Sequence, residues 1–373
     1  MKSYSSRFLN WLDGLVNSLA YKKRFVGEYV NLYKKRKLIQ SVVLTSEQRR
    51  EIDQLWERSY GKKIPYHWHR LYTYYTGTFD VNYFPEIFYS TILERLYNDS
   101  HVALCAEDKS QLDLLLRQPG MATSSTIPLI ASNVQGKYYD SDHRMINEDE
   151  FVSILHNVGK CVIKPSVDSD SGRGVRVLEI KNGIDVKTEE EISDILNSYR
   201  EDYLVQSFLK THESVKLLNS SSVNTIRIVT YICENHIFHA PLAMRIGTGN
   251  AEVDNIHAGG LVIGLSDDGV LNEYAFSEYG QKLYKHPTSD ITFKGYRIPN
   301  VGMAISLVEQ SHLLIPRLTF ISWDVTILED GTPVIIEMNT RNQSAWFPQM
   351  VNGQSIFGSN TEKMIKMLKK DGN

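Results

Sequence analysis

The chain has 373 residues, of which 42% are hydrophobic and 23% are charged, and its formal net charge at pH 7 is -3. This length can bury a large core and predicts two or three domains of a globular, soluble protein. The slightly acidic balance excludes the basic surface that general nucleic-acid binding favours. The first residues do not resemble a secretory signal and no apolar run is long enough to span a bilayer, so we expect a cytoplasmic protein.

The three cysteines also favour a cytoplasmic protein. Cys105, Cys161 and Cys233 are isolated, form no CxxC motif and lie among apolar neighbours. This pattern predicts reduced, buried thiols, as in a reducing cytosol.

Residues 1–60 are predicted to be helical. Apolar residues of Phe8–Leu19 recur at helical spacing, and Thr45 with Gln48 indicates a capping box at the start of a further helix. Between them, Tyr21–Lys37 carries seven basic residues and one acid, Glu28, interleaved with aromatic and aliphatic residues. Two interpretations stay open: an amphipathic helix lying on the inner face of an anionic membrane, or a helix that packs on the body and keeps a solvated face.

From Gly61 the chain becomes rich in aromatic residues. His67 and His69 would share one face of a strand, but no third nitrogen or sulfur ligand accompanies them, so zinc is not favoured. The nearby Trp68 and the tyrosines up to Tyr75 suit either a sugar-stacking surface or an aromatic core, and the core is favoured.

Helices and strands are mixed along the rest of the chain, which predicts an α+β class. The expected helices are Glu86–Tyr97, Lys109–Arg117, Glu148–Asn157, Glu189–Tyr199 and Met303–Leu314. The expected strands are His101–Cys105, Ile127–Ala131, Lys137–Asp140, Cys161–Lys164, Val175–Ile180, Tyr203–Phe208, Thr225–Glu234, His236–Ile246 and Gly260–Leu265.

The segment Ile321–Asn339 predicts an antiparallel hairpin that turns at Glu329-Asp330-Gly331. Asp324 lies on the first strand, and Glu337 and Asn339 share one face of the second. Two carboxylates and an amide oxygen on apolar strands suit a hard cation such as Mg²⁺, which brings phosphates with it.

Two further segments indicate nucleotide binding. Lys164 ends an apolar strand, and the small residues of Ser169–Gly174 follow it. Glycines let backbone N–H groups approach phosphate oxygens, and a lysine supplies a point charge. The apolar strand Leu204–Leu209 offers its backbone to an adenine edge, and Glu213 follows within reach of ribose hydroxyls.

The order of these parts resembles the ATP-grasp superfamily, and more closely its sugar-transfer-associated branch. The closer resemblance rests on Tyr83-Phe84-Pro85, Glu107-Asp108-Lys109, Ile163-Lys164-Pro165, Ser222–Arg227, Asp254-Asn255 with Ala258-Gly259-Gly260, and Trp323-Asp324-Val325. It implies an ATP-grasp fold in which two α+β subdomains clasp ATP behind a helical lead. The expected segments are residues 1–60 (helical), 61–125 (substrate side), 126–208 (lid with the glycine loop) and 209–373 (magnesium site).

The resemblance also implies roles for single residues. ATP would be bound by Lys109, Lys164, Ser169, Ser171, Gly172, Gly174, Gln206, Phe208 and Glu213, with His212 a rival for the ribose. Mg²⁺ would be held by Asp324, Glu337 and Asn339, and catalysis would use Arg227, Arg245, Asn255 and His257. Gln206 stands where an acid is usual, and His257 would either deprotonate the amine or be structural.

These parts predict an ATP-dependent carboxylate–amine ligase that works through an acyl phosphate. The resemblance implies amide formation in bacterial surface-polysaccharide assembly, whether capsule, exopolysaccharide or O-antigen. The partners would be a small or sugar-linked carboxylate and an amine, such as an amino acid or amino sugar. The alternatives are a phosphotransferase acting on a sugar or polyol hydroxyl and a binding module that holds nucleotide without turnover.

Overall fold

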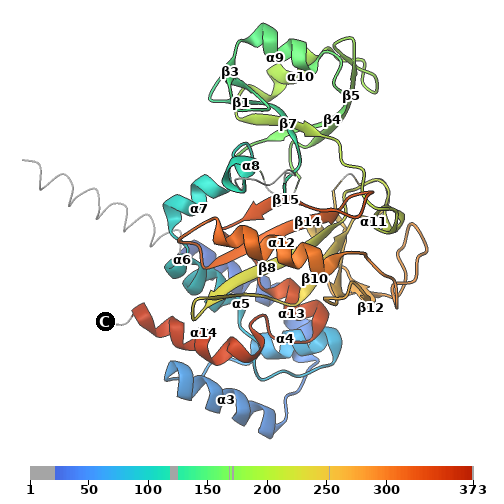
Figure 1. Ribbon diagram of the computed structural model, residues 1–373. Coiled ribbons are helices and arrows are strands. Elements are labelled where there is room, and N and C mark those ends of the chain that lie inside the picture. The colour runs from blue at the N-terminus through green and yellow to red at the C-terminus, as the bar shows by residue number, and fades with distance from the viewer. Residues whose placement is uncertain (1–21, 118–124, 168, 170–171, 252, 372–373) are drawn as a thin grey trace, which may run out of the picture. The chain divides into compact units, whose positions relative to one another are not determined.

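The computed structural model describes residues 22–117, 125–167, 169, 172–251 and 253–371 (Figure 1). The chain divides into two compact units, one formed by Met1–Asn98 with Asn342–Asn373 and the other by Asp99–Arg341. Residues 342–373, which the sequence grouped with the magnesium hairpin, therefore belong with the N-terminal helices. No helix of the described ranges combines the length and apolarity that a membrane crossing requires.

The regular elements in the described part of the first unit are helices, which are joined by loops. Residues 22–34 form a helix, followed by α2 (Arg36–Gln40), α3 (Ser46–Tyr60), α4 (His67–Thr76), α5 (Glu86–Phe88), the π-helix η1 (Tyr89–Leu93) and α6 (Glu94–Tyr97). The C-terminal part adds α13 (Trp346–Asn352), η3 (Gly358–Asn360), α14 (Thr361–Met367) and η4 (Leu368–Asp371). The capping box is confirmed, since the Gln48 N–H donates to Thr45 Oγ1 over 3.1 Å and the Thr45 N–H to Gln48 Oε1 over 2.9 Å.

Aromatic side chains form the core of this unit. Trp56, Tyr72, Tyr75 and Phe84 are fully buried, and the Trp56 and Phe84 ring centroids lie 5.9 Å apart. The interpretation of this region as core is thus confirmed. The predicted strand face for the two histidines is wrong, because both lie on α4, where residues two apart point in different directions.

Buried acids tie the C-terminal segment to the N-terminal helices. Glu94 accepts hydrogen bonds from the backbone N–H groups of Asn342 and Gln343, both over 2.7 Å. Glu86 accepts from the Ala345 N–H over 3.0 Å, and burial raises the pKa of Glu86 well above its usual range. These bonds satisfy backbone donors that follow the last strand of the other unit.

The second unit contains two antiparallel sheets. The first has the order β3-β2-β1-β7-β4-β5-β6 and consists of β1 (Leu129–Val134), β2 (Lys137–Asp140), β3 (Met145–Ile146), β4 (Gly159–Pro165), β5 (Arg176–Lys181), β6 (Ile184–Asp185) and β7 (Tyr203–Ser207). Helices α9 (Glu148–Leu155) and α10 (Ile192–Tyr199) bury Phe151 and Ile195 against it. Gln135 and Gly136, both at positive φ, form the turn of the β1–β2 hairpin.

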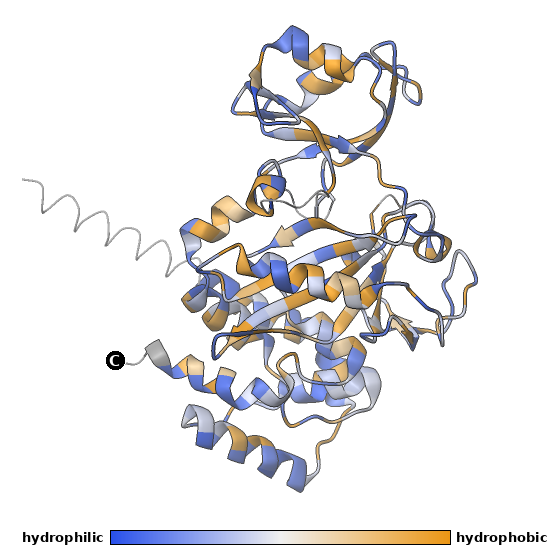
Figure 2. Cartoon of the chain, in the orientation of Figure 1, coloured by the Kyte–Doolittle hydropathy of each residue, from blue (hydrophilic) through white to orange (hydrophobic). Residues whose placement is uncertain are grey.

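The second sheet has the order β13-β12-β11-β10-β8-β14-β15, with β9 also paired to β8. Its strands are β8 (Thr225–Cys233), β9 (His236–His239), β10 (Leu242–Ile246), β11 (Leu261–Leu265), β12 (Leu271–Phe276), β13 (Lys282–Leu283), β14 (Phe320–Ile327) and β15 (Pro333–Asn339). Helix α12 (Val301–Leu313) alternates hydrophobic and polar residues (Figure 2) and buries Ala304 and Val308 in the core of this sheet.

Four local predictions are wrong. His101–Cys105 is not a strand but part of helix α7 (Ser100–Ala106), because the Asp99 carboxylate caps the N–H groups of His101 and Val102. The helix predicted from Lys109 shortens to α8 (Leu112–Leu115), and Cys105 is exposed while the other two cysteines are buried. The strand predicted over His236–Ile246 is divided into β9 and β10.

Candidate functional site

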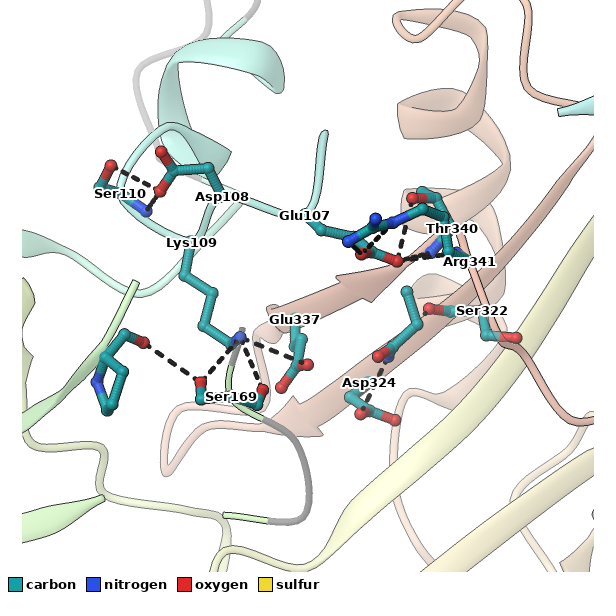
Figure 3. A network of polar contacts seen from close by, with 12 residues as sticks. Glu107, Asp108, Lys109, Ser110, Ser169, Ser322, Asp324, Glu337, Thr340 and Arg341 are labelled. Atoms are coloured by element: carbon teal, nitrogen blue, oxygen red, sulfur yellow. Dashed lines mark hydrogen bonds and ion pairs between the residues drawn. The ribbon is translucent and has the colours of Figure 1, made fainter. Parts of the chain in front are cut away.

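Lys109 lies in a turn between α7 and α8, and its side chain reaches the glycine loop. The Asp108 carboxylate accepts from the Ser110 N–H over 2.9 Å, which stops the chain from forming a helix here. The Lys109 N–H donates to Ser166 O over 3.0 Å. Its Nζ donates to Ser169 O and Ser169 Oγ over 3.2 and 3.3 Å and lies 3.8 Å from Glu337 Oε1 (Figure 3).

A second lysine converges on the same carboxylate. Lys164 lies on β4 and is 7% exposed. Burial lowers the pKa of Lys164 to about 8, with the Glu337 carboxylate acting to raise it and the Lys109 ammonium to lower it. The Glu337 carboxylate therefore lies beside Lys109 and within electrostatic range of Lys164.

Asp324 is the centre of a buried ion cluster. It pairs in register with Glu337 on β15 and with Arg227 on β8. Arg227 donates to both carboxylate oxygens of Asp324, over 2.7 and 3.1 Å, and Arg245 Nη2 lies 3.1 Å from Oδ2. Burial opposes the ionisation of Asp324, but the two guanidinium groups hold its pKa below the usual value.

Two residues complete this cluster that the sequence did not assign to the site. Arg245 Nη2 lies 3.3 Å from Asp254 Oδ1, and Arg245 Nε donates to Thr225 Oγ1 over 3.0 Å. The Thr225 hydroxyl in turn donates to Asp254 Oδ2. Burial raises the pKa of Asp254, although Arg245 acts to lower it. The only sequence signal for Asp254 was its place in the motif with Asn255.

The predicted magnesium ligands are neighbours. Asn339 Nδ2 lies 3.5 Å from Asp324 Oδ2, and Glu337 is the register partner of Asp324. Among the described residues no group of three or more His, Cys, Asp and Glu side chains suits a metal ion, but this set is made of two carboxylates and an amide. Oxygen donors of this kind fit Mg²⁺, which keeps several waters and takes few protein ligands.

Glu107 fixes the end of β15 beside the Lys109 turn. Its carboxylate accepts from the Thr340 N–H over 3.0 Å and from the Arg341 N–H over 2.7 Å (Figure 3). It also pairs with the Arg341 guanidinium, with Nη2 2.6 Å from Oε2. Because Lys109 is two residues away from Glu107 and Asn339 precedes Thr340, this one carboxylate helps to set the spacing between Lys109 and Asn339, for which phosphate and metal binding are predicted.

The glycine loop adopts a backbone that favours glycine. Gly172 has φ +74° and Gly174 φ +75°, and Ser171 lies outside the described residues. A Cβ at Gly172 would lie 2.3 Å from Val253 Cγ1, and one at Gly174 would lie 2.9 Å from Pro165 Cγ. Side chains are therefore disfavoured at both positions by conformation and by space.

The residues predicted for the adenosine lie along β7 and just after it. Gln206 is buried and pairs with Leu129 and Val162, so it lies on a central strand. Lys160 Nζ lies 3.8 Å from the centroid of the Phe208 ring. Glu213 begins α11 (Glu213–Leu218) and is exposed.

His212, the alternative for the ribose, is engaged otherwise. Its Nδ1 accepts from the Ser214 N–H over 3.2 Å and so caps α11. The assignment of Glu213 or His212 to the ribose stays a prediction.

The contacts of Asn255 and His257 lead away from the ion cluster. The Asn255 side chain caps the 3-10 helix η2 (Ile256–Ala258) through the His257 N–H, over 2.8 Å. The His257 ring is 60% exposed, and its Nδ1 lies 3.0 Å from Glu278 Oε1. Their catalytic roles stay predictions, and Asp254 is the residue of this segment that contacts Arg245.

Two antiparallel sheets with convergent lysines, an acidic hairpin and a glycine loop define a nucleotide-binding protein of the ATP-grasp class. The family described as sugar-transfer associated ATP-grasp matches residues 89–364, well over half of the chain. The chain therefore belongs to this family, which confirms the predicted family, the α+β ATP-grasp fold and, at the level of the family, an ATP-grasp enzyme. Comparison with curated proteins gave no match.

Solved structures give distant likenesses. The ATP-grasp ligase PsnB, complexed with minimal precursor, Mg and ADP, is 14% identical with a TM-score of 0.41, covering 74% of this chain and 62% of its own. Biotin carboxylase from Campylobacter jejuni is 12% identical with a TM-score of 0.40, at 73% and 48% coverage. Carboxyaminoimidazole ribonucleotide synthase from Aspergillus clavatus, complexed with ATP, is 10% identical with a TM-score of 0.39, at 68% and 52% coverage. The chain spans about half the length of the solved proteins it matches.

Proposed function

We propose that this protein is an ATP-dependent carboxylate–amine ligase that activates its acid as an acyl phosphate. The observation that carries the proposal is the convergence of three cationic side chains on the hairpin carboxylates. Lys109 lies 3.8 Å from Glu337, and Arg227 and Arg245 both lie within 3.1 Å of Asp324. Burial of Lys164 beside them keeps water from weakening these charges.

The proposed first step is attack of a substrate carboxylate oxygen on the γ-phosphorus of ATP. The new P–O bond gives an acyl phosphate, and the bond to the β-phosphate oxygen breaks to release ADP. Lys109 and Lys164 would bind the phosphates, and the Arg227 and Arg245 guanidinium groups would stabilise charge on the transferred phosphoryl group. Mg²⁺, held by Asp324, Glu337 and Asn339, would neutralise the phosphate oxygens.

In the second step the nitrogen of an amine attacks the acyl carbon. The C–O bond to phosphate breaks, so an amide and inorganic phosphate form, and the amine nitrogen loses a proton. Asp254 is a candidate acceptor of this proton, since burial raises the pKa of its carboxyl and it lies at the end of the cationic cluster. His257, which is exposed beside Glu278, is the alternative.

A hydroxylamine trap tests the acyl phosphate. With ATP, Mg²⁺ and the acid, hydroxylamine captures an acyl phosphate as a hydroxamate, whereas a phosphotransferase acting on a hydroxyl yields none. We expect hydroxamate from the wild type, little from Arg245→Met, and wild-type amounts from Arg144→Met, a matched change of an exposed arginine. ADP release with a stable phosphorylated product and no hydroxamate would favour the phosphotransferase, and nucleotide binding without turnover would favour a binding module.

We propose a substrate that belongs to bacterial surface-polysaccharide assembly, such as a uronic acid joined to an amino acid or an amino sugar joined to an acid. The support is the sugar-transfer association of the family, which extends over residues 89–364. Because ATP is the phosphoryl donor, we propose a cytoplasmic reaction. ADP release measured across a panel of uronic acids and amines tests the pairing, and release with amino acids alone would contradict a sugar-linked partner.

A further inference from the structure

The helix at residues 22–34 has one face that packs on its own unit. Leu32 is buried, and Arg24 donates to Gln343 O over 3.1 Å and lies 3.8 Å from Glu94 Oε1. Burial raises the pKa of Glu28, although Arg24 acts to lower it. At the end of this face Lys35 Nζ lies 3.6 Å from the Trp346 ring centroid. The interpretation of this helix as packed on the body thus accounts for one side of it.

The other face carries apolar residues that remain exposed. Val26 is 59% exposed, Val30 47% and Tyr33 65%. Phe25 and Tyr29, with ring centroids 5.1 Å apart, are 37% and 41% exposed. Val26, Val30 and Tyr33, at spacings of three, four and seven residues, form one stripe along the helix, which we call the outer stripe. Tyr29 lies between the outer stripe and the packed face, because its ring centroid is 6.1 Å from that of the buried Trp68.

Basic residues border the outer stripe. Lys22, Lys23, Lys34, Arg36 and Lys37 are all exposed. The Arg36 guanidinium lies 4.3 Å from the centroid of the Tyr33 ring, so the two side chains extend together. The one acid between Lys22 and Lys37 is Glu28, and it belongs to the packed face. The exposed side of this helix therefore combines apolar and cationic groups without an acid.

We propose that the outer stripe lies on an anionic lipid bilayer, with Val26, Val30 and Tyr33 in the headgroup region and the lysines on lipid phosphates. Apolar side chains, an amphipathic tyrosine and flanking lysines are the composition of interfacial helices. Each lysine near an anionic surface strengthens the attraction several-fold, and the buried apolar area adds to it. The proposal concerns the first unit and goes beyond the reaction proposed above, and it assigns the enzyme a place at the membrane surface.

The test is vesicle flotation of the full-length protein at low salt. We expect the wild type to float with vesicles of mixed anionic and zwitterionic lipid and to remain behind with purely zwitterionic ones. Lys22→Glu with Lys23→Glu and Lys34→Glu should reduce binding about a hundredfold. Val26→Ser with Val30→Ser and Tyr33→Ser should reduce it about tenfold or more, since these changes leave the packed face intact.

The matched control carries the same charge change on the other unit. Lys137→Glu with Lys181→Glu and Lys216→Glu replaces three exposed lysines and should float like the wild type. Thermal unfolding of each variant checks that the fold is kept. An equal loss in the control, unchanged flotation of the stripe variants, or no flotation of the wild type would overturn the proposal. So would a wild-type dimer that the serine variant dissociates, because a second copy would then cover the stripe.

Discussion

Replacing Lys164 by methionine should raise the stability of the protein and lower its activity. Burial lowers the pKa of Lys164 from 10.5 to about 8, so its protonated form is disfavoured in the folded protein. A shift of this size corresponds to about 3 kcal/mol. Methionine keeps the aliphatic contacts and removes the buried charge, so Lys164→Met should raise the free energy of unfolding by as much as about 3 kcal/mol at neutral pH. The same variant should lose most of its turnover, because the lysine would bind phosphate.

The dependence of stability on pH has a definite sign. Below about pH 8 both the folded and the unfolded chain hold the Lys164 proton, and the full penalty of burial is present. Between about pH 8 and 10.5 the unfolded chain binds more protons at this residue, so the free energy of unfolding should rise with pH. The KM for ATP should also rise above about pH 8, because neutral Lys164 no longer attracts phosphate.

Urea unfolding at several pH values measures this effect. The control is Lys181→Met, an exposed lysine on β5, whose stability should follow the wild type at every pH. The difference between the wild type and Lys164→Met should be largest near pH 7 and should disappear only above about pH 10.5. Equal stability of the two methionine variants at neutral pH would refute the argument that burial disfavours the Lys164 charge.

Three further outcomes are expected. Glu337→Gln should abolish turnover while ATP affinity, measured by calorimetry, falls much less, because the metal contributes most in the transition state; near-wild-type turnover would contradict the magnesium assignment. Gly172→Ala places a Cβ against Val253 at φ +74°, so the free energy of unfolding, measured with urea, should fall by about 1–2 kcal/mol. Turnover should fall more steeply than this loss of stability explains. An unchanged rate would show that turnover does not need this loop conformation. Glu107→Gln weakens the bonds to Arg341 and the adjacent backbone, so it should lower stability by about 1–3 kcal/mol in thermal unfolding. The KM for ATP should also rise measurably. A wild-type KM would show that Glu107 does not help to position the ATP-binding residues.

The hairpin of the site was predictable because its signals are local. Glu337 and Asn339 lie two residues apart on β15 and so share one face, and Gly331, with φ +87°, closes the turn between the strands. The exact pairing of Asp324 with Glu337 does not follow from sequence spacing, because the register shifts between Asp324 and Val325, and Val325 pairs with Ile335. The capping box at Thr45, like the hairpin itself, was predictable from local signals.

The predictions that failed concern residues whose structure depends on tertiary contacts. The apolar pattern at His101–Cys105 suits a strand, but in the fold the Asp99 side chain caps a helix there. An aspartate acts as a cap only when the backbone before the helix has the right conformation, which the sequence pattern does not show. Asp254 is about thirty residues from Thr225 and seventy from Asp324, and only the sheet brings Arg245 between them. No local period marks such a residue, so its role became visible only in the fold.

The ion cluster around Asp324 also bears on how fast a ligand is captured. Arg227 and Arg245 carry two positive charges, and Asp324 and Asp254 carry two negative ones, so the cluster is balanced within itself. A balanced, buried cluster exerts little field at a distance, because opposite charges a few ångströms apart cancel beyond their own size. We therefore expect Lys109 and Lys164 to provide the long-range attraction of a polyphosphate, and added salt should slow association by screening these two lysines. The arginine contacts form only after the ligand has docked, so salt should affect them little.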